Sequence, residues 1–311
     1  MSLLELRSEI ALAGTSEKEA PGGRAAPAGR RGSVPEQLFG YDIVGRLGEG
    51  AGSTVYEVSD RNTGRHYALK HVVVRDAKHL RFVEQLEREH EVGQAVRHEN
   101  LRQPLTIHYR RTLLRRVTEA GLLMELVEGW PISVPTTPVS QALTYLVRIS
   151  RTLEAFHRAG YVHCDLKPQN LLVDRELRVK LIDLGQACRT GTVKQRVQGT
   201  PDFISPEQVK CREVTPRTDV YNLGATAYCM LTARKIPTLF TMKKGKNSFL
   251  LDDRIAPPAE LVPEIPPLLS KLVMECIALK PDQRPEMADV TRRLEAIRYT
   301  MSRSASARGS K

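Results

Sequence analysis

The residues with the clearest chemistry lie in the run His163–Asn170, which reads HCDLKPQN, and in the tripeptide DLG that begins at Asp183. Asp165 offers a carboxylate that can accept a proton, and Lys167 places a cation two residues further on. Asn170 and Asp183 supply amide and carboxylate oxygens, the ligands that hard divalent cations prefer. Together these groups suit the transfer of a phosphoryl group to a hydroxyl.

A glycine-rich turn precedes this run at Gly48–Val55, which reads GEGAGSTV. Glycines allow backbone N–H groups to approach phosphate oxygens closely. Taken alone the turn is weak evidence, because many hairpins are rich in glycine. It joins two expected strands, which favours a loop that covers phosphates over the strand-to-helix loops of other nucleotide folds.

The next expected strand contains Tyr67–Lys70, which reads YALK. Side chains alternate along a strand, so Ala68 and Lys70 share one face. If that face lines a cleft, the small Ala68 leaves room for a flat base and Lys70 reaches phosphates. For an isolated lysine, exposure to solvent on a half-buried strand would be the better interpretation.

Lys70 needs a carboxylate to fix its position, and the helix expected over residues 78–97 offers four glutamates: Glu84, Glu87, Glu89 and Glu91. Only Glu89 lies on the apolar stripe formed by Phe82, Leu86, Gly93 and Val96. Glu87 and Glu91 fall about 160° away from it on a helix of 3.6 residues per turn. We therefore predict a Lys70–Glu89 pair.

The elements expected around these residues predict an α+β fold of two lobes. Strands are expected at 41–47, 54–59, 66–74, 105–115 and 120–127, with the helix 78–97 between them, so residues 41–127 form a small antiparallel lobe. Residues 128–298 read mainly as helices and form the large lobe. Residues 1–40 are expected to be a mostly disordered extension, because residues 14–37 are rich in Gly, Ala, Pro and charge, and residues 299–311 are expected to be a disordered basic tail.

Composition narrows the class of protein. The chain has 311 residues and a net charge of +11, with part of the excess in six arginines between residues 97 and 116. No aromatic residues alternate with these arginines as in a recognition motif, so we expect a solvated strand pair and no nucleic-acid partner. Five scattered cysteines indicate a reducing cytoplasm, and no apolar run is long enough to predict a membrane partner.

In this order and spacing, the motifs make the region from Tyr41 to Arg298 resemble the eukaryotic-type serine/threonine protein kinase family, most closely its bacterial members. The resemblance implies that Asp165 accepts the proton of the substrate hydroxyl, while Lys167 neutralises charge on the transferred phosphate. Asn170 and Asp183 would hold Mg²⁺, with Mn²⁺ as the alternative. ATP would be bound by residues of both lobes: Leu47, Gly48, Gly50, Ser53, Val55, Ala68, Lys70, Met124, Glu125, Val127 and Leu172. Among these, Met124 resembles the gatekeeper and Glu125 to Val127 the hinge.

The resemblance continues beyond the metal-binding residues. Thr190, Thr192, Thr200 and Glu207 fall in the stretch that matches an activation segment, and Thr200 stands where Ser/Thr kinases contact the catalytic aspartate. With Lys167, it implies a protein substrate with a Ser or Thr acceptor. Asp219 matches an aspartate that braces the catalytic loop, and Arg284 matches the partner of Glu207.

Two departures from the family pattern carry predictions. Cys164 replaces the arginine that pairs with a phosphorylated residue of the activation segment, so activity should not require phosphorylation of Thr190 or Thr192. An inert buried thiol is the expected state of Cys164, with a redox role as the alternative. Gly93 contributes no side chain to the apolar contact that Leu184 would make with the helix 78–97. This predicts a loosely held helix that depends on an activating partner or a dimer contact.

Two other functions remain in view: a pseudokinase that binds nucleotide as a scaffold, and a kinase for small-molecule hydroxyls. A scaffold has no need of the whole set Lys70, Glu89, Asp165, Asn170 and Asp183. The segment from Gly199 to Glu207 resembles a platform for protein substrates, which argues against a small-molecule acceptor. We therefore predict an active ATP-dependent protein kinase.

Overall fold

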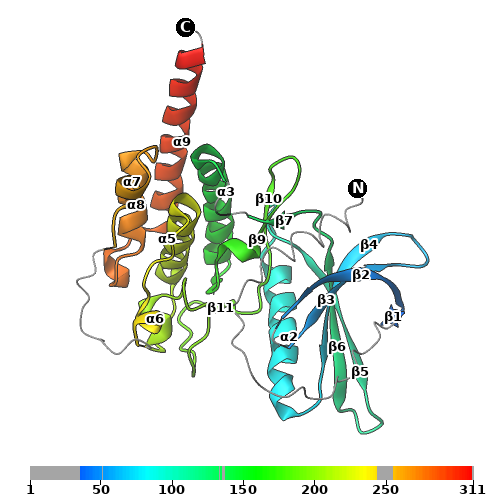
Figure 1. Ribbon diagram of the computed structural model, residues 1–311. Coiled ribbons are helices and arrows are strands. Elements are labelled where there is room, and N and C mark those ends of the chain that lie inside the picture. The colour runs from blue at the N-terminus through cyan, green and yellow to red at the C-terminus, as the bar shows by residue number, and fades with distance from the viewer. Residues whose placement is uncertain (1–35, 51, 133, 135–136, 244–254, 310–311) are drawn as a thin grey trace, which may run out of the picture. The chain divides into compact units, whose positions relative to one another are not determined.

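The computed structural model describes residues 36–50, 52–132, 134, 137–243 and 255–309 (Figure 1). Its first part is a six-stranded antiparallel sheet in the order β1-β2-β3-β4-β6-β5. The strands are β1 (Gln37–Leu38), β2 (Tyr41–Glu49), β3 (Thr54–Ser59), β4 (His66–Val73), β5 (Pro104–Arg111) and β6 (Val117–Glu125). After the short turn η1 (Ala77–His79), the helix α2 (Leu80–Ala95) packs on β5 and β6. The expected small lobe with one long helix is confirmed.

The second part is mainly helical and begins after the short strand β7 (Trp130–Pro131). Its helices are α3 (Val139–Arg158), α4 (Pro206–Val209), α5 (Pro216–Thr232), α6 (Leu239–Lys243), α7 (Pro258–Leu261), α8 (Pro267–Cys276) and α9 (Met287–Gly309). The other described elements of this part are short: β8 (Tyr161–Val162), η3 (Pro168–Asn170), β9 (Leu171–Val173), β10 (Val179–Leu181), β11 (Cys188–Arg189) and η4 (Pro281–Gln283). None of the described helices is both long and apolar enough to cross a membrane.

Helix α5 is the centre of the large apolar core. Every residue from Thr218 to Thr232 is buried, and α3, α8 and α9 pack against this helix. A helix that is buried all round can hold polar side chains only where they have hydrogen-bond partners. Asp219, in the first turn of α5, is such a residue, and it faces the catalytic loop.

Two expectations about the chain ends are wrong where the structure describes them. Residues 37–38 form β1 within the predicted extension, because Leu38 is buried in the apolar cluster of Leu69 and Leu123. At the other end, α9 continues through the predicted tail to Gly309. No glycine or proline interrupts residues 299–308, and Met301 packs against the large core, so the helix has no reason to stop. The disorder predicted for residues 1–35 and 310–311 lies outside the described residues.

The space that Gly93 was expected to leave empty beside Leu184 is filled in the structure. A Cβ atom on Gly93 would lie 2.1 Å from Cγ of Pro104 and 3.5 Å from Leu184. The proline ring at the start of β5 therefore occupies the space next to Leu184 that a side chain at position 93 would need. That space is filled from a strand, and α2 packs closely against it.

We predict that Gly93→Ala lowers the free energy of unfolding by about 1–3 kcal/mol, the usual cost of overpacking. Alanine favours a helix over glycine by about 1 kcal/mol, so a net loss would isolate the steric conflict with Pro104. Urea unfolding measures the effect. Gly48→Ala is the control, because no atom lies within 4 Å of its Cβ position. Adding Pro104→Ala should restore part of the loss, and a Gly93→Ala protein that is stabilised would contradict this packing.

Candidate active site

The expected catalytic loop, His163–Asn170, follows β8 and is held by Asp219 of α5. The Asp219 carboxylate accepts hydrogen bonds from the backbone N–H groups of His163 and Cys164, both at 2.9 Å. It also pairs with Nε2 of His157 at 3.0 Å. Cys164 has a φ of 66°, a left-handed conformation that costs energy for a residue with a side chain. The two bonds from consecutive N–H groups to one buried carboxylate stabilise that turn.

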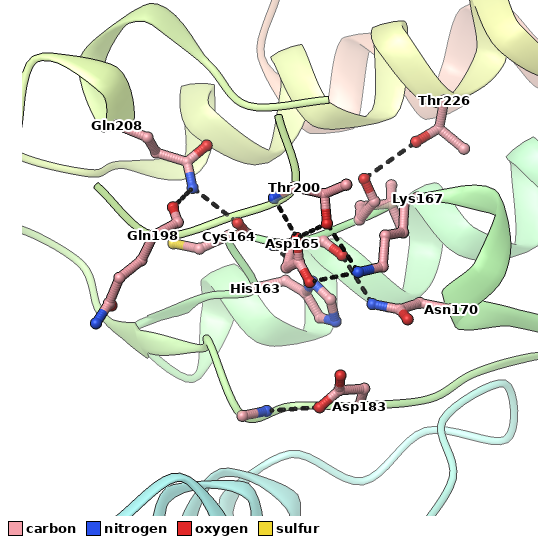
Figure 2. A network of polar contacts seen from close by, with 12 residues as sticks. His163, Cys164, Asp165, Lys167, Asn170, Asp183, Gln198, Thr200, Gln208 and Thr226 are labelled. Atoms are coloured by element: carbon pink, nitrogen blue, oxygen red, sulfur yellow. Dashed lines mark hydrogen bonds and ion pairs between the residues drawn. The ribbon is translucent and has the colours of Figure 1, made fainter. Parts of the chain in front are cut away.

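The turn aims Asp165 at the activation segment (Figure 2). Its Oδ1 accepts hydrogen bonds from the Thr200 backbone N–H at 2.9 Å and from Thr200 Oγ1 at 2.8 Å. Lys167 Nζ donates to Asp165 Oδ2 at 3.0 Å and to Thr200 Oγ1 at 2.7 Å. The predicted contact between Thr200 and the catalytic loop is therefore present, and Lys167 joins it. The carboxylate is oriented by three donors, an arrangement that can position a hydroxyl.

Asn170 and Asp183 present oxygen donors in the same region (Figure 2). Asn170 Nδ2 donates to the backbone carbonyl of Asp165 at 2.9 Å, which directs the amide oxygen elsewhere. Asp183 stands at a φ of 67° and accepts a hydrogen bond from the Gly185 N–H at 3.3 Å. One carboxylate and one amide oxygen fit a hard divalent cation that takes its other ligands from phosphates or water. These residues fit the predicted metal site.

Lys70 pairs with Glu89, the glutamate that the helical stripe predicted. Its Nζ lies 2.7 Å from Glu89 Oε2 and 3.1 Å from Asp183 Oδ1. Burial alone would lower the pKa of Lys70, but the carboxylates of Asp183 and Glu89 outweigh it and raise the pKa above its ordinary value. In turn, the charge of Lys70 holds the pKa of Asp183 well below its usual range. Both groups therefore stay ionised at neutral pH.

Arg102 belongs to this cluster, although the sequence placed it in a basic surface. Its Nη2 lies 3.4 Å from Glu89 Oε1, and its side chain is only 10% exposed. The backbone at this residue is fixed as well, since the Arg102 N–H donates to the carbonyl of Leu181 in β10, and this position lets the side chain point inward. For Arg102, the expectation of a solvated arginine is wrong.

Four of the residues predicted to bind ATP lie in or beside one apolar cluster. Val55 and Leu47 border the apolar cluster that contains Ala68 and Met124, and Ala68 is paired with Met124 across β4 and β6. Leu172 lies between Leu171 and Val173, which both belong to the large core, so its side chain lies on the opposite face of β9.

Glu125, which the sequence predicts to lie in the hinge, makes contacts that its position alone did not indicate. Its carboxylate accepts from Lys180 Nζ of β10 at 2.6 Å and from the Gln103 N–H at 3.2 Å. Val127 follows as a partly buried residue after the end of β6. The ion pair with Lys180 links the end of the six-stranded sheet to the second sheet.

The glycine-rich turn closes with a hydrogen bond from the Gly50 N–H to the carbonyl of Ser53 at 2.8 Å. Gly48 and Gly50 are exposed, and Ser53 is half-buried. Phe82 of α2 packs against Gly52, where a Cβ would lie 2.2 Å from the ring. The sequence placed Phe82 on the inward stripe of α2, but Val83 takes that buried position.

The expected activation segment begins as β11, which pairs with β8 so that Cys188 lies opposite Val162. Thr190 is exposed and Thr192 is half-buried. The segment ends at Glu207, whose carboxylate forms a two-pronged ion pair with Arg284 at 2.7 and 2.9 Å. The side chains are 6% and 0% exposed. Thr218 adds a hydrogen bond to Glu207 at 2.9 Å, so this end of the segment is anchored in the core.

The sequence profile of the protein kinase domain matches residues 41–293, and these residues contain every element of the site described above. The chain belongs to the protein kinase family. It is 30% identical over 276 residues to a serine/threonine-protein kinase, PknD, of Chlamydia pneumoniae, a match that covers 78% of this chain and 29% of that protein. A probable serine/threonine-protein kinase of Streptomyces coelicolor is 28% identical over 275 residues, or 83% of this chain and 40% of the relative.

A human protein named hormonally up-regulated neu tumor-associated kinase is 32% identical over 198 residues, which are 60% of this chain and 27% of that protein. The chain thus spans less than half the length of these relatives. Membership of the family implies ATP and a divalent metal in general, and the oxygen donors of Asn170 and Asp183 agree with that requirement.

Sequence reasoning did not predict the contacts of four side chains in and around this site: Phe82, Arg102, Pro104 and Lys180. Each acts through a contact with a distant segment. Proline is tolerated at the first residue of a strand, so Pro104 suits the start of β5, but no local pattern pairs it with Gly93. Arg102 gave no usable signal, since five other arginines surround it in the sequence.

We predict that Arg284→Met lowers the free energy of unfolding by about 3–5 kcal/mol at about pH 7, because it leaves Glu207 buried and unpaired. Burial raises the pKa of Glu207, but the bonds from Arg284 outweigh it and lower the pKa below its ordinary value of 4.5. The stability from this pair is therefore present above that value and lost as the pH falls through the lowered pKa.

The difference between wild type and Arg284→Met should accordingly shrink at about pH 4, where Glu207 of the variant becomes protonated. Urea unfolding at both pH values measures it. Arg61→Met is the matched control, since its pair with Asp42 is exposed and should contribute less than about 1 kcal/mol. A difference that grows as the pH falls would contradict the assigned role of the buried pair.

Proposed function

We propose that this protein transfers the γ-phosphate of ATP to serine or threonine hydroxyls of a protein substrate, with Mg²⁺ as the metal. The observation that carries the proposal is the position of Asp165. Thr200 and Lys167 bind its two carboxylate oxygens, and Asn170 binds its carbonyl. A proton acceptor, a cation and a metal ligand are thereby fixed to one another within a single loop.

Each residue would act through position and charge. Asp165 orients the substrate hydroxyl and accepts its proton, a contribution typically worth roughly 10²–10⁴ in rate. Lys167 lies beside the Asp165 carboxylate, where it can neutralise charge on the phosphate in transfer. Lys70, held by Glu89, binds phosphate oxygens of ATP, and the metal held by Asn170 and Asp183 would supply further charge neutralisation.

ATP would lie below the turn Gly48–Ser53, with adenine between Val55 and Ala68 on one side and Leu172 on the other. Glu125 and Val127 would offer backbone hydrogen bonds to the base, and Met124 would limit the depth of the pocket. The buried position of Ala68 and Met124 in one apolar cluster supports this placement. Mn²⁺ is the alternative metal, because the same oxygen donors suit it.

Preference for serine and threonine rests on Lys167 and Thr200, which contact each other and Asp165. The names of the relatives agree with it. A scaffold without transfer activity is the alternative, but it would not need Lys70 to pair with both Glu89 and Asp183. We further propose a cytoplasmic location and a protein partner as substrate. An activating partner or a dimer contact stays part of the proposal, although Pro104 fills the space beside Gly93.

The test is transfer of labelled γ-phosphate from ATP and Mg²⁺ to a mixed protein substrate, followed by phosphoamino-acid analysis. Wild type should yield phosphoserine or phosphothreonine. Asp165→Asn should reduce kcat by about 10²–10⁴, since the proton acceptor is lost. Asp282→Asn is the matched control at an exposed aspartate and should retain full activity. Measurable ATP binding without transfer by wild type would support the scaffold and overturn the proposal.

A further inference from the structure

Two thiols meet where the catalytic loop contacts the activation segment. Cys164 Sγ and Cys188 Sγ lie 3.8 Å apart, on the residue before Asp165 and on β11. We propose that Cys164 and Cys188 are a redox modification site, at which a hydroperoxide forms a disulfide that lowers kinase activity reversibly. The effect on activity rests on the proposed function, whereas the disulfide itself does not.

The fold holds the two thiols together from both sides. Cys188 is paired with Val162 across β11 and β8, and Cys164 follows Val162 by two residues. Val162 and Val214 enclose the thiols in a small apolar cluster of their own. Cys164 is 1% exposed, whereas Cys188 is half-buried, so a small oxidant reaches Cys188 first. Two sulfurs already in contact need no large movement of the chain to form a bond.

The electrostatic surroundings assign the two thiols different parts. The contact with Cys164 lowers the pKa of Cys188 to about 7, and the charge of Lys194 and a hydrogen bond with Thr192 add to this against the opposing effect of burial. The same contact, together with burial, raises the pKa of Cys164. Cys188 is therefore the thiolate and attacking nucleophile, and Cys164 the thiol that hydrogen bonds to it.

The chemistry balances with the peroxide as the oxidant. The Cys188 thiolate attacks one peroxide oxygen, the O–O bond breaks, and Cys188 becomes a sulfenic acid while the leaving oxygen takes a proton and departs as water or an alcohol. The sulfur of Cys164 then attacks the Cys188 sulfur, the S–O bond breaks, and the hydroxide leaves as water with the Cys164 proton. The two thiols lose two electrons in total, and the peroxide gains them.

We expect disulfide formation to shift the catalytic loop by a small distance. The S–S bond is about 2.05 Å long, far shorter than the present contact of 3.8 Å, so Cys164 is drawn toward β11. Its N–H is bonded to Asp219 and its carbonyl accepts from Gln208 Nε2 at 2.7 Å, and the next residue is Asp165. A displacement of about 1 Å at a reacting group can cost roughly 10²-fold in rate, so a clear loss of kcat is expected.

The experiment treats the reduced full chain with a small excess of hydrogen peroxide and then blocks the free thiols. Peptides prepared without reductant are mapped by mass spectrometry, and initial rates are measured in parallel. We expect a linked pair of peptides containing Cys164 and Cys188, a fall in kcat of roughly 10- to 100-fold, and recovery with dithiothreitol. Cys188→Ser should form no such link and keep its rate under peroxide.

Cys211→Ser is the matched control, because Cys211 is also half-buried yet lies outside the pair, and it should respond as wild type does. The proposal is overturned if no Cys164–Cys188 link forms, if the link leaves kcat unchanged, or if Cys188→Ser loses activity to the same extent. If the link forms under peroxide but the untreated, reduced protein transfers no phosphate, the proposed function is overturned and the thiol pair is still established.

Discussion

The carboxylate of Asp219 is the constraint on which the rest of the active site depends. It is fully buried at the start of α5, where burial opposes ionisation, but the hydrogen bond from His157 and the backbone N–H groups of the catalytic loop lower its pKa below the ordinary value. These bonds hold Cys164 in its left-handed conformation and so determine where Asp165 points. Asp165 accepts hydrogen bonds from Thr200, and these bonds fix the position of the activation segment around Thr200. The buried charge of Asp219, which has a hydrogen-bond donor at each carboxylate oxygen, thus orders the catalytic loop and the activation segment.

The same arrangement explains how the segment can be ordered with a cysteine in place of the arginine of the kinase pattern. Position 164 offers no cation to a phosphorylated residue. Short stretches of backbone pairing hold the segment instead: β11 pairs with β8, and Val193 forms a bridge with Glu213. Gln208 adds a tie, since its side chain donates to the carbonyls of Cys164 and Gln198. These contacts need no modification, and they leave the small cysteine free to contact Cys188.

Periodicity and motif spacing were sufficient for the parts of the site that are local in the sequence. The stripe of α2 selected Glu89 from four glutamates, and strand alternation put Ala68 and Lys70 on one face. The failures concern contacts between distant segments. The space left by Gly93 is filled by Pro104, the guanidinium of Arg102 turns inward to Glu89, and β1 forms because Leu38 finds an apolar cluster on the sheet. Such contacts follow from tertiary packing, which a local pattern does not contain.

We expect Asp219 and the backbone pairing to order this kinase site without phosphorylation of the activation segment. The most direct measurement compares the initial rate of phosphoryl transfer by phosphatase-treated wild type with that of the double variant Thr190→Ala, Thr192→Ala. We expect rates equal within about twofold, because position 164 offers no cation to pair with a phosphate. A large loss in the double variant that acidic residues at 190 and 192 restore would contradict it.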